Sequence, residues 1–393
     1  MGGVGVAVGL ALSSVVVFKL SGSAFISGFA GTATVLGAAL LALPIAKAAG
    51  KKGRRAGLSL AYIAALTGCV ISVAGITIAS WPLLLAGLVL VGGGSAGNYA
   101  ARYSATDLSP DGHAARHLSL VVWAATVGSV AGPNLAEPAD AIGRKLGLVG
   151  TAGPFAFAAL AFALALLVVV AGLRPDPLVL ARSLKPSDGQ HPAGNRTIRD
   201  AWQILRTTPT ARRALIAIAV SHTAMVSVMS MTPVHLTHEG AAISVIGIVI
   251  SLHIAGMFVL SPVVGWLADK AGKVPVLLAG MVLLLAAGLL AGTAGHAVWQ
   301  ITVGLTLLGI GWSCGLVAGS AMLSESVAIE RRPAVQGVSD LLMNVCGATG
   351  TVLAGAIVGG VSYLALGLSV GAMVAAAALW LALTALRSGP ATA

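Results

Sequence analysis

Apolar stretches long enough to cross a lipid bilayer recur along almost the whole of this chain. A membrane-spanning helix needs about 20 mostly apolar residues, and twelve such runs fit within the 393 residues. They lie at 1–20, 23–46, 56–79, 82–106, 115–135, 151–173, 212–235, 241–267, 274–294, 297–323, 334–360 and 362–386. With 57% hydrophobic and 9% charged residues, a soluble domain of this length could not hide so much apolar surface. The sequence predicts an all-α membrane protein with twelve transmembrane helices.

The net charge of +11 reflects topology rather than contact with nucleic acid. Lys and Arg gather in the cytoplasmic loops of membrane proteins. Of the 23 Lys and Arg, only Lys19, Arg144 and Lys145 fall in connections of the opposite parity. We therefore expect a lipid bilayer and no nucleic acid as partners, with both termini and the long central connection in the cytoplasm.

Motifs of enzymes and nucleotide-binding proteins are missing from the sequence. The phosphate-binding pattern G-x-x-x-x-G-K-[ST] does not occur, and no Ser or Cys nucleophile with a partnered base can be identified. The three cysteines show no C-x-x-C spacing. We expect neither an enzyme nor a bound cofactor.

The chain divides into an N-terminal six-helix half at 1–173, a cytoplasmic linker at 174–211 and a C-terminal six-helix half at 212–393. The linker is rich in Pro and Gly, and its part at 197–205 has the pattern of a short amphipathic helix. A weak internal repeat supports the division, because the segment 265–273 after span 8 aligns with the segment 46–54 after span 2. Duplicated halves that hold a substrate between them are a transporter architecture.

The segment Gly265-x-Leu267-x-Asp269-Lys270-x-Gly272-Lys273 resembles the loop signature of the major facilitator superfamily. The resemblance implies that fold, alternating access, and a cytoplasmic gate in which Asp269 and Lys270 take part. The first copy departs from the signature, because Gly50 stands at the acidic position. By the same alignment, span 1 looks short at its cytoplasmic end. A misplaced start codon, a lost stub and a naturally short first helix all remain open.

Two pairs of soft donors occur at one-turn spacing on consecutive spans. Met225 and Met229 lie in span 7, and His253 and Met257 lie in span 8. Residues i and i+4 share a helical face, and both pairs fall near the middle of their spans, where carriers hold substrates. Thioether and imidazole are ligands that suit copper, above all Cu(I). Three more potential donors continue toward the outer mouth, Met231, His235 and His238.

The motifs Met225-Val-Ser-Val-Met229 and His253-Ile-Ala-Gly-Met257 resemble the signature of CcoA-type bacterial copper importers. We expect Cu(I) from the donor set and a monomer from the fold, and the resemblance implies a bacterial inner-membrane carrier that brings copper into the cytoplasm. It also implies that the copper supplies assembly of a haem–copper oxidase, with a cytoplasmic copper chaperone as a possible partner. Relatives that carry riboflavin keep a small organic substrate open, and Gly128-Ser-Val-Ala-Gly132-Pro133 is similar to a signature of drug exporters. We interpret that last segment as close helix packing. A metal sensor that does not transport is a further alternative.

Other polar residues in the spans are secondary candidates. His222 is either an auxiliary ligand or a hydrogen-bonded packing residue, and Cys314 and Cys346 are either thiolate donors or structural thiols. Arg102 is a candidate for a charge relay with Asp107 or with the central linker, although an arginine that snorkels from a helix end is the simpler interpretation. Asp340 is a candidate either for proton coupling or for a structural hydrogen bond. These gating and coupling candidates complete the predicted site.

Overall fold

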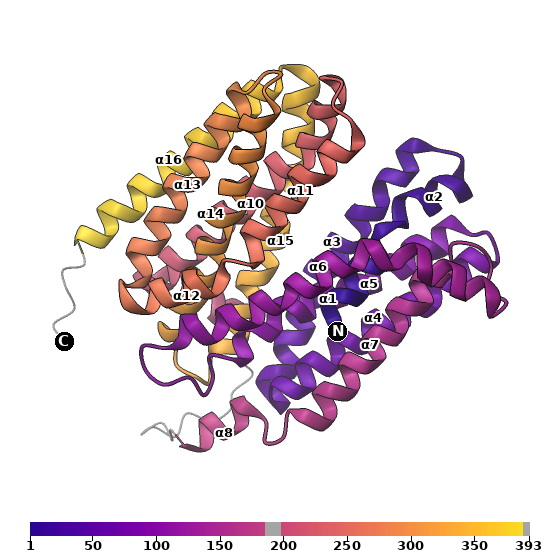
Figure 1. Ribbon diagram of the computed structural model, residues 1–393. Coiled ribbons are helices and arrows are strands. Elements are labelled where there is room, and N and C mark those ends of the chain that lie inside the picture. Colours follow the sequence, from indigo (N-terminus) through magenta and orange to yellow (C-terminus); the bar gives the residue numbers. More distant parts are fainter. Residues whose placement is uncertain (185–197, 388–393) are drawn as a thin grey trace. The chain divides into compact units, whose positions relative to one another are not determined.

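The computed structural model describes residues 1–184 and 198–387 and is helical throughout (Figure 1). Within these ranges there are sixteen α-helices and no strand. Their bounds are α1 Gly2–Ala11, α2 Ser13–Ser21, α3 Ala24–Lys52, α4 Arg54–Thr77, α5 Trp81–Ser104, α6 Ala114–Lys145, α7 Gly153–Gly172, α8 Pro177–Leu184, α9 Ile198–Thr207, α10 Pro209–His238, α11 Ile243–Phe258, α12 Ser261–Lys270, α13 Lys273–Thr293, α14 Val298–Glu325, α15 Arg332–Gly360 and α16 Tyr363–Arg387.

Twelve of the helical segments are long and apolar enough to cross a membrane. Span 1 consists of α1 and α2, span 8 consists of α11 and α12, and span 6 continues from α7 into α8. The predicted fold class and the number of spans are confirmed. The amphipathic helix expected in the linker is α9, and the Pro- and Gly-rich middle of the linker, 185–197, lies outside the described residues.

The helices form two compact units. Unit 1 comprises Met1–Leu108, Val127–Trp202 and Ala328–Asn344, and unit 2 comprises Ser109–Thr126, Gln203–Val327 and Val345–Ala393. Each unit therefore consists mainly of one half of the sequence and includes one segment from the other half. The domain boundaries at 173 and 211 stay a prediction.

Glycines let the helices of unit 1 approach each other closely. A Cβ at Gly92 of α5 would lie 2.6 Å from the backbone nitrogen of Ala38 in α3, and one at Gly68 of α4 would lie 2.5 Å from the backbone nitrogen of Val91. A Cβ at Gly128 of α6 would lie 2.5 Å from the backbone carbon of Gly3, which agrees with the packing interpretation of that segment. Backbone-to-backbone contact of this kind is how helices associate where water supplies no hydrophobic drive.

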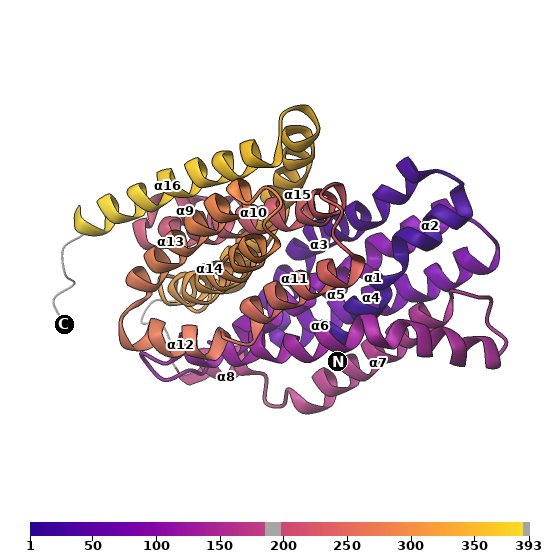
Figure 2. The same ribbon diagram turned by 45° about the horizontal axis from the view of Figure 1, so that its top comes forward.

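Helix α14 is the centre of unit 2. It lies among α10, α11, α12 and α13 (Figure 2), and its residues 311–324 are all buried. Three of its glycines face three different neighbours: Gly309 faces α11, Gly311 faces α13 and Gly315 faces α10. Small residues on several faces allow one helix to serve as the common support of the others, and the predicted copper ligands lie on two of these neighbours.

Adding one methyl group at Gly92 tests the close approach of α5 to α3. We expect Gly92→Ala to lower the free energy of unfolding by about 1–3 kcal/mol, because the new Cβ meets backbone atoms that cannot move aside. Gly31→Ala in α3 is the matched control, since no atom lies within 4 Å of a Cβ there. Denaturant unfolding of the purified variants in detergent measures the difference. Equal stability of the two variants would contradict the packing argument.

Candidate functional site

His253 of α11 is buried, and a single hydrogen bond to a neighbouring helix orients its ring. The side chain is fully buried, with 0% of its surface exposed. Its Nδ1 lies 2.8 Å from the backbone oxygen of Leu305 in α14, and because a carbonyl only accepts, Nδ1 carries the proton. Nε2 therefore presents a lone pair, and this buried atom has no hydrogen-bond partner among the described residues. Ligating histidines characteristically fix their tautomer through such a bond to the second ring nitrogen.

The methionines lie on the two helices that flank this part of α14. Met257, one turn along α11 from His253, is 8% exposed, and Met225 of α10 is 4% exposed, whereas Met229 is half-buried. The residues of α10 one turn before Met225 contact α14 near Trp312 and Gly315. His253 and Met257 thus lie against α14 near residues 305–309, and α10 meets α14 near 312–315 just before Met225. That all four donors meet at one point stays a prediction.

A cluster of rings adjoins the predicted ligands. Trp312 of α14 is 2% exposed, and its Nε1 donates a hydrogen bond of 3.2 Å to Nδ1 of His222. Its ring also meets Phe258 of α11 edge-on, with 5.7 Å between centroids. Of the two roles predicted for His222, the hydrogen-bonded one is present. Trp312 was not predicted, because it lies 90 residues from His222 in the sequence.

The C-terminal end of α10 carries a polar cluster. His235 stacks on Tyr363 of α16, with 4.2 Å between ring centroids, and its Nδ1 lies 3.9 Å from Glu239. Glu239 also pairs with His296, a residue that the sequence did not single out. His238 is exposed and Met231 is half-buried. These residues lie in the last turns of α10 and near them, and their role as a row of copper donors stays a prediction.

The cysteines offer little support for a thiolate site. Cys314 is buried in α14, Cys346 is half-buried in α15, and both are free thiols. Among the described residues, no group of three or more His, Cys, Asp or Glu side chains is arranged to hold a metal ion. A metal site in unit 2 therefore depends on thioether donors together with His253.

Arg102 of unit 1 is part of a buried ion pair. It is 1% exposed, and its Nη2 lies 2.6 Å from Oδ1 of Asp340 in α15. Two further bonds satisfy the guanidinium, to the backbone oxygen of Tyr99 and to the hydroxyl of Tyr103. The expectation of a snorkelling arginine was wrong, and so was its pairing with Asp107, because Asp340 offers a carboxylate inside the unit.

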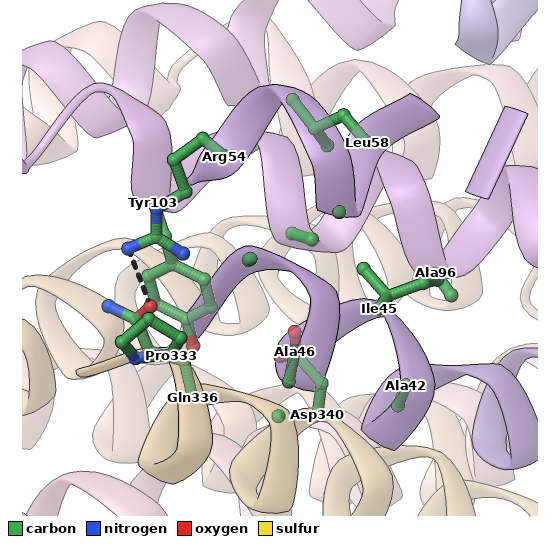
Figure 3. A pocket seen from close by; sticks show the side chains of 14 residues that line it. Ala42, Ile45, Ala46, Arg54, Leu58, Ala96, Tyr103, Pro333, Gln336 and Asp340 are labelled. Carbon is green, nitrogen blue, oxygen red and sulfur yellow. Dashed lines mark hydrogen bonds between the residues drawn. The ribbon is translucent and has the colours of Figure 1, made fainter. Parts of the chain in front are cut away.

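Asp107 instead binds Arg54 in a bidentate pair. Nε and Nη2 of Arg54 lie 2.6 and 2.9 Å from the two carboxylate oxygens, and Nη2 also donates to Oε1 of Gln336 at 2.8 Å. Between these groups and Asp340 lies a cavity of about 20 Å³, which is room for one water molecule. Figure 3 shows Arg54, Tyr103 and Gln336 on one side of it and Asp340 beside Ala46. The arrangement binds the start of α15 to α4 and α5 through charge.

The loop signature makes a helix cap inside unit 2. The carboxylate of Asp269 accepts hydrogen bonds from the backbone nitrogens of Ala115 and Arg116, at 3.1 and 2.8 Å. These are donors in the first turn of α6, where a negative charge is favourable. Lys270 lies with its Nζ 4.8 Å from the centroid of the Trp266 ring. A gating role for the two residues stays a prediction.

The sequence profile of the Major Facilitator Superfamily matches residues 2–242 and 214–392, which together cover almost the whole chain. The chain belongs to the Major Facilitator Superfamily. It is a membrane transporter and not an enzyme, in agreement with the analysis of the sequence.

Relatives within the superfamily share about a third of their residues with this transporter. The uncharacterized MFS-type transporter YdeG of Bacillus subtilis is 34% identical over 373 residues, which are 93% of this chain and 85% of YdeG. The riboflavin transporter RfnT of Brucella anthropi is 28% identical over 309 residues, 78% of this chain and 74% of RfnT. The resemblance to CcoA-type importers stays a prediction.

Solved superfamily structures share the fold. The fucose:proton symporter FucP of E. coli covers 98% of this chain and 97% of its own, with a TM-score of 0.69 and 15% identity. The proton:xylose symporter XylE covers 97% of this chain and 93% of its own, with a TM-score of 0.73 and 14% identity. At such identities the likeness concerns the fold alone.

Removing one member of the Arg102–Asp340 pair tests its role in this transporter. We expect Asp340→Leu to cost about 3–5 kcal/mol of stability, because it leaves a buried guanidinium without a counter-charge. Adding Arg102→Met should recover most of that loss, since an apolar pair of similar volume replaces the ions. Denaturant unfolding of both variants in detergent gives the comparison. A double variant as unstable as the single one would show that the pair does not act as a unit.

Proposed function

We propose that this transporter imports copper, as Cu(I), across the bacterial inner membrane by alternating access. The observation that carries the proposal is His253, whose Nδ1 is bonded to Leu305 and whose Nε2 is buried without a partner in the described structure. Leaving a buried polar atom unsatisfied costs about 1–3 kcal/mol. A metal ion bound at Nε2 would satisfy this atom and offset that cost.

The donors that accompany His253 favour a soft ion. Met257 lies one turn away on the same helical face, and Met225 is buried in α10, a second neighbour of α14. Thioether sulfur prefers Cu(I), and imidazole is compatible with it. Neither donor has to lose a proton before it binds, so capture and release need no change in its protonation.

The charge distribution of unit 2 favours a monovalent ion. Its four carboxylates are Asp111, Glu239, Asp269 and Glu325, and each lies in a turn or at the end of a helix. A divalent cation in the apolar middle of the unit would therefore meet no carboxylate ligand. Because the cost of desolvation rises with charge, Cu(I) is the better fit.

In the proposed cycle, both termini are cytoplasmic and the carrier works as a monomer. Copper first passes the polar cluster at His235 and then binds at His253 of α11. It leaves into the cytoplasm after the two halves of the carrier rock. A cytoplasmic chaperone then receives it for assembly of a haem–copper oxidase. Alternation of this kind around a central site is how repeat-based carriers operate.

Ligand substitution is the direct test of the copper site. We expect His253→Ala to lower the affinity of the purified protein for Cu(I) at least about tenfold, since loss even of outer-shell partners has effects of that size. Met257→Leu and Met225→Leu should weaken binding while keeping the packing, because the volume is conserved. His113→Ala in the exposed turn before α6 is the control. Binding is measured by competition with a Cu(I) chelator under reducing conditions.

The copper site is wrong if the His253 and methionine variants bind Cu(I) as the control does. Zinc that binds as tightly as Cu(I) would contradict the argument from donor softness. The same variants in vesicles, assayed for uptake of copper, separate a carrier from a sensor that binds metal without moving it.

A flat organic substrate is the second candidate. The observation that favours it is the 28% identity to a riboflavin transporter over 78% of this chain. The cluster of Trp312, Phe258 and His222 supplies rings of the kind on which such a substrate stacks. In this structure those rings pack against one another and Trp312 is buried, so a stacked substrate would have to separate them.

Competition between substrates decides between the two candidates. For a copper carrier we expect excess riboflavin to leave the uptake of copper into vesicles unchanged, because an ion site of four small donors has no room for a three-ring molecule. Uptake of labelled riboflavin should not exceed that of empty vesicles. Saturable riboflavin uptake that is lost in Trp312→Ala would replace the copper proposal with the second candidate.

A further inference from the structure

The residue at the acidic position of the loop signature makes different contacts in the two copies. In the second copy, the carboxylate of Asp269 caps the first turn of α6. In the first copy, the aligned residue is Gly50, near the end of α3. Without a side chain, Gly50 cannot cap the helix that it faces.

The start of α15, which lies opposite Gly50, differs from the start of α6, which Asp269 caps. Ala115 is the second residue of α6, and Pro333 is the second residue of α15. A Cβ at Gly50 would lie 3.8 Å from Cβ of Pro333, so the two residues face each other. Proline has no backbone N–H, and a carboxylate placed at 50 would therefore lack one of the two donors that Asp269 uses.

Helix α8 supplies a contact at this place. Nη1 of Arg182 donates to the backbone oxygen of Gly50 at 3.0 Å, and Nη2 donates to the backbone oxygen of Glu330 at 3.4 Å. One guanidinium thereby joins the end of α3 to the turn that precedes α15. The planar fork of arginine can reach two carbonyl groups at once, which a lysine cannot do with the same geometry.

The other end of α8 is anchored by Asp176, whose carboxylate caps two helices. Oδ1 accepts from the backbone nitrogens of Leu178 and Val179, at 3.0 and 3.2 Å, in the first turn of α8. Oδ2 accepts from the backbone nitrogen of Arg55 at 2.7 Å, in the first turn of α4. Gly53, with φ of 90°, lets the chain pass beneath the carboxylate.

We propose that α8, through Arg182 and Asp176, is a clamp that performs in the first half the task of the missing signature carboxylate. It holds residues 328–344, which come from the second half of the sequence, against α3 and α4 inside unit 1. The clamp has to open whenever this segment leaves α3 during transport. The start of the central linker is therefore a working part of the carrier rather than a tether.

Hydrogen–deuterium exchange of the purified protein tests the clamp without any substrate. We expect Arg182→Ala to speed exchange about five- to tenfold in peptides covering 46–54 and 328–336, because it removes charge-assisted bonds on which their protection depends. The peptide covering 112–118, which Asp269 caps, should not change. Arg182→Lys should resemble Arg182→Ala, and Asp176→Asn should expose the peptide that contains Arg55.

A rescue and a control complete the experiment. In the Arg182→Ala background, Gly50→Asp together with Pro333→Ala rebuilds both halves of the conventional cap, and we expect protection of 328–336 to return. Arg206→Ala removes an exposed arginine of α9 and should change none of these peptides. The proposal is overturned if Arg182→Ala exchanges like Arg206→Ala, or if the rebuilt cap restores no protection.

Discussion

A charged side chain buried among apolar helices requires an opposite charge within hydrogen-bond distance, and unit 1 is assembled around that requirement. Arg102 of α5 finds its carboxylate in Asp340 of α15, and Arg54 of α4 finds its own in Asp107. Separating such a pair costs several kcal/mol. The first turns of α15 are bound to α4 and α5 for this reason, although the sequence places α15 in the other half of the chain.

The middle of unit 2 is held together by contacts between neutral groups. Its helices meet around α14 through glycines, and the contacts of the middle stretch of α14 involve neutral groups: an imidazole, an indole and backbone carbonyls. Burying a neutral nitrogen without a hydrogen-bond partner costs much less free energy than burying a charge without a counter-charge. A cation that enters unit 2 therefore meets polarisable donors and no fixed anion, which is a selective environment in itself.

Features whose determinants are local in sequence were predictable, and features that depend on distant partners were not. Hydropathy alone located all twelve spans, the amphipathic pattern located α9, and the loop signature singled out Asp269. The partner of Arg102 was not predictable, since 238 residues separate it from Asp340. Both interpretations of His222 were open until Trp312 was placed against it. The role of α8 was missed because eight residues next to a Pro-rich linker carry too little periodicity to suggest a docked helix.

The two signature loops show how a duplicated fold can meet one mechanical need with opposite charges. A helix start presents unsatisfied N–H groups and attracts an anion, while a helix end presents unsatisfied carbonyls and attracts a cation. Asp269 exploits the start of α6. Pro333 removes one N–H from the start of α15. The acceptors that Arg182 binds here are carbonyls, that of Gly50 in the last turn of α3 and that of Glu330. A guanidinium is the side chain that suits such acceptors. Gly50 at the acidic position of the signature and Arg182 in α8 therefore belong together, because a cation replaces the signature's anion as the group that joins the helices.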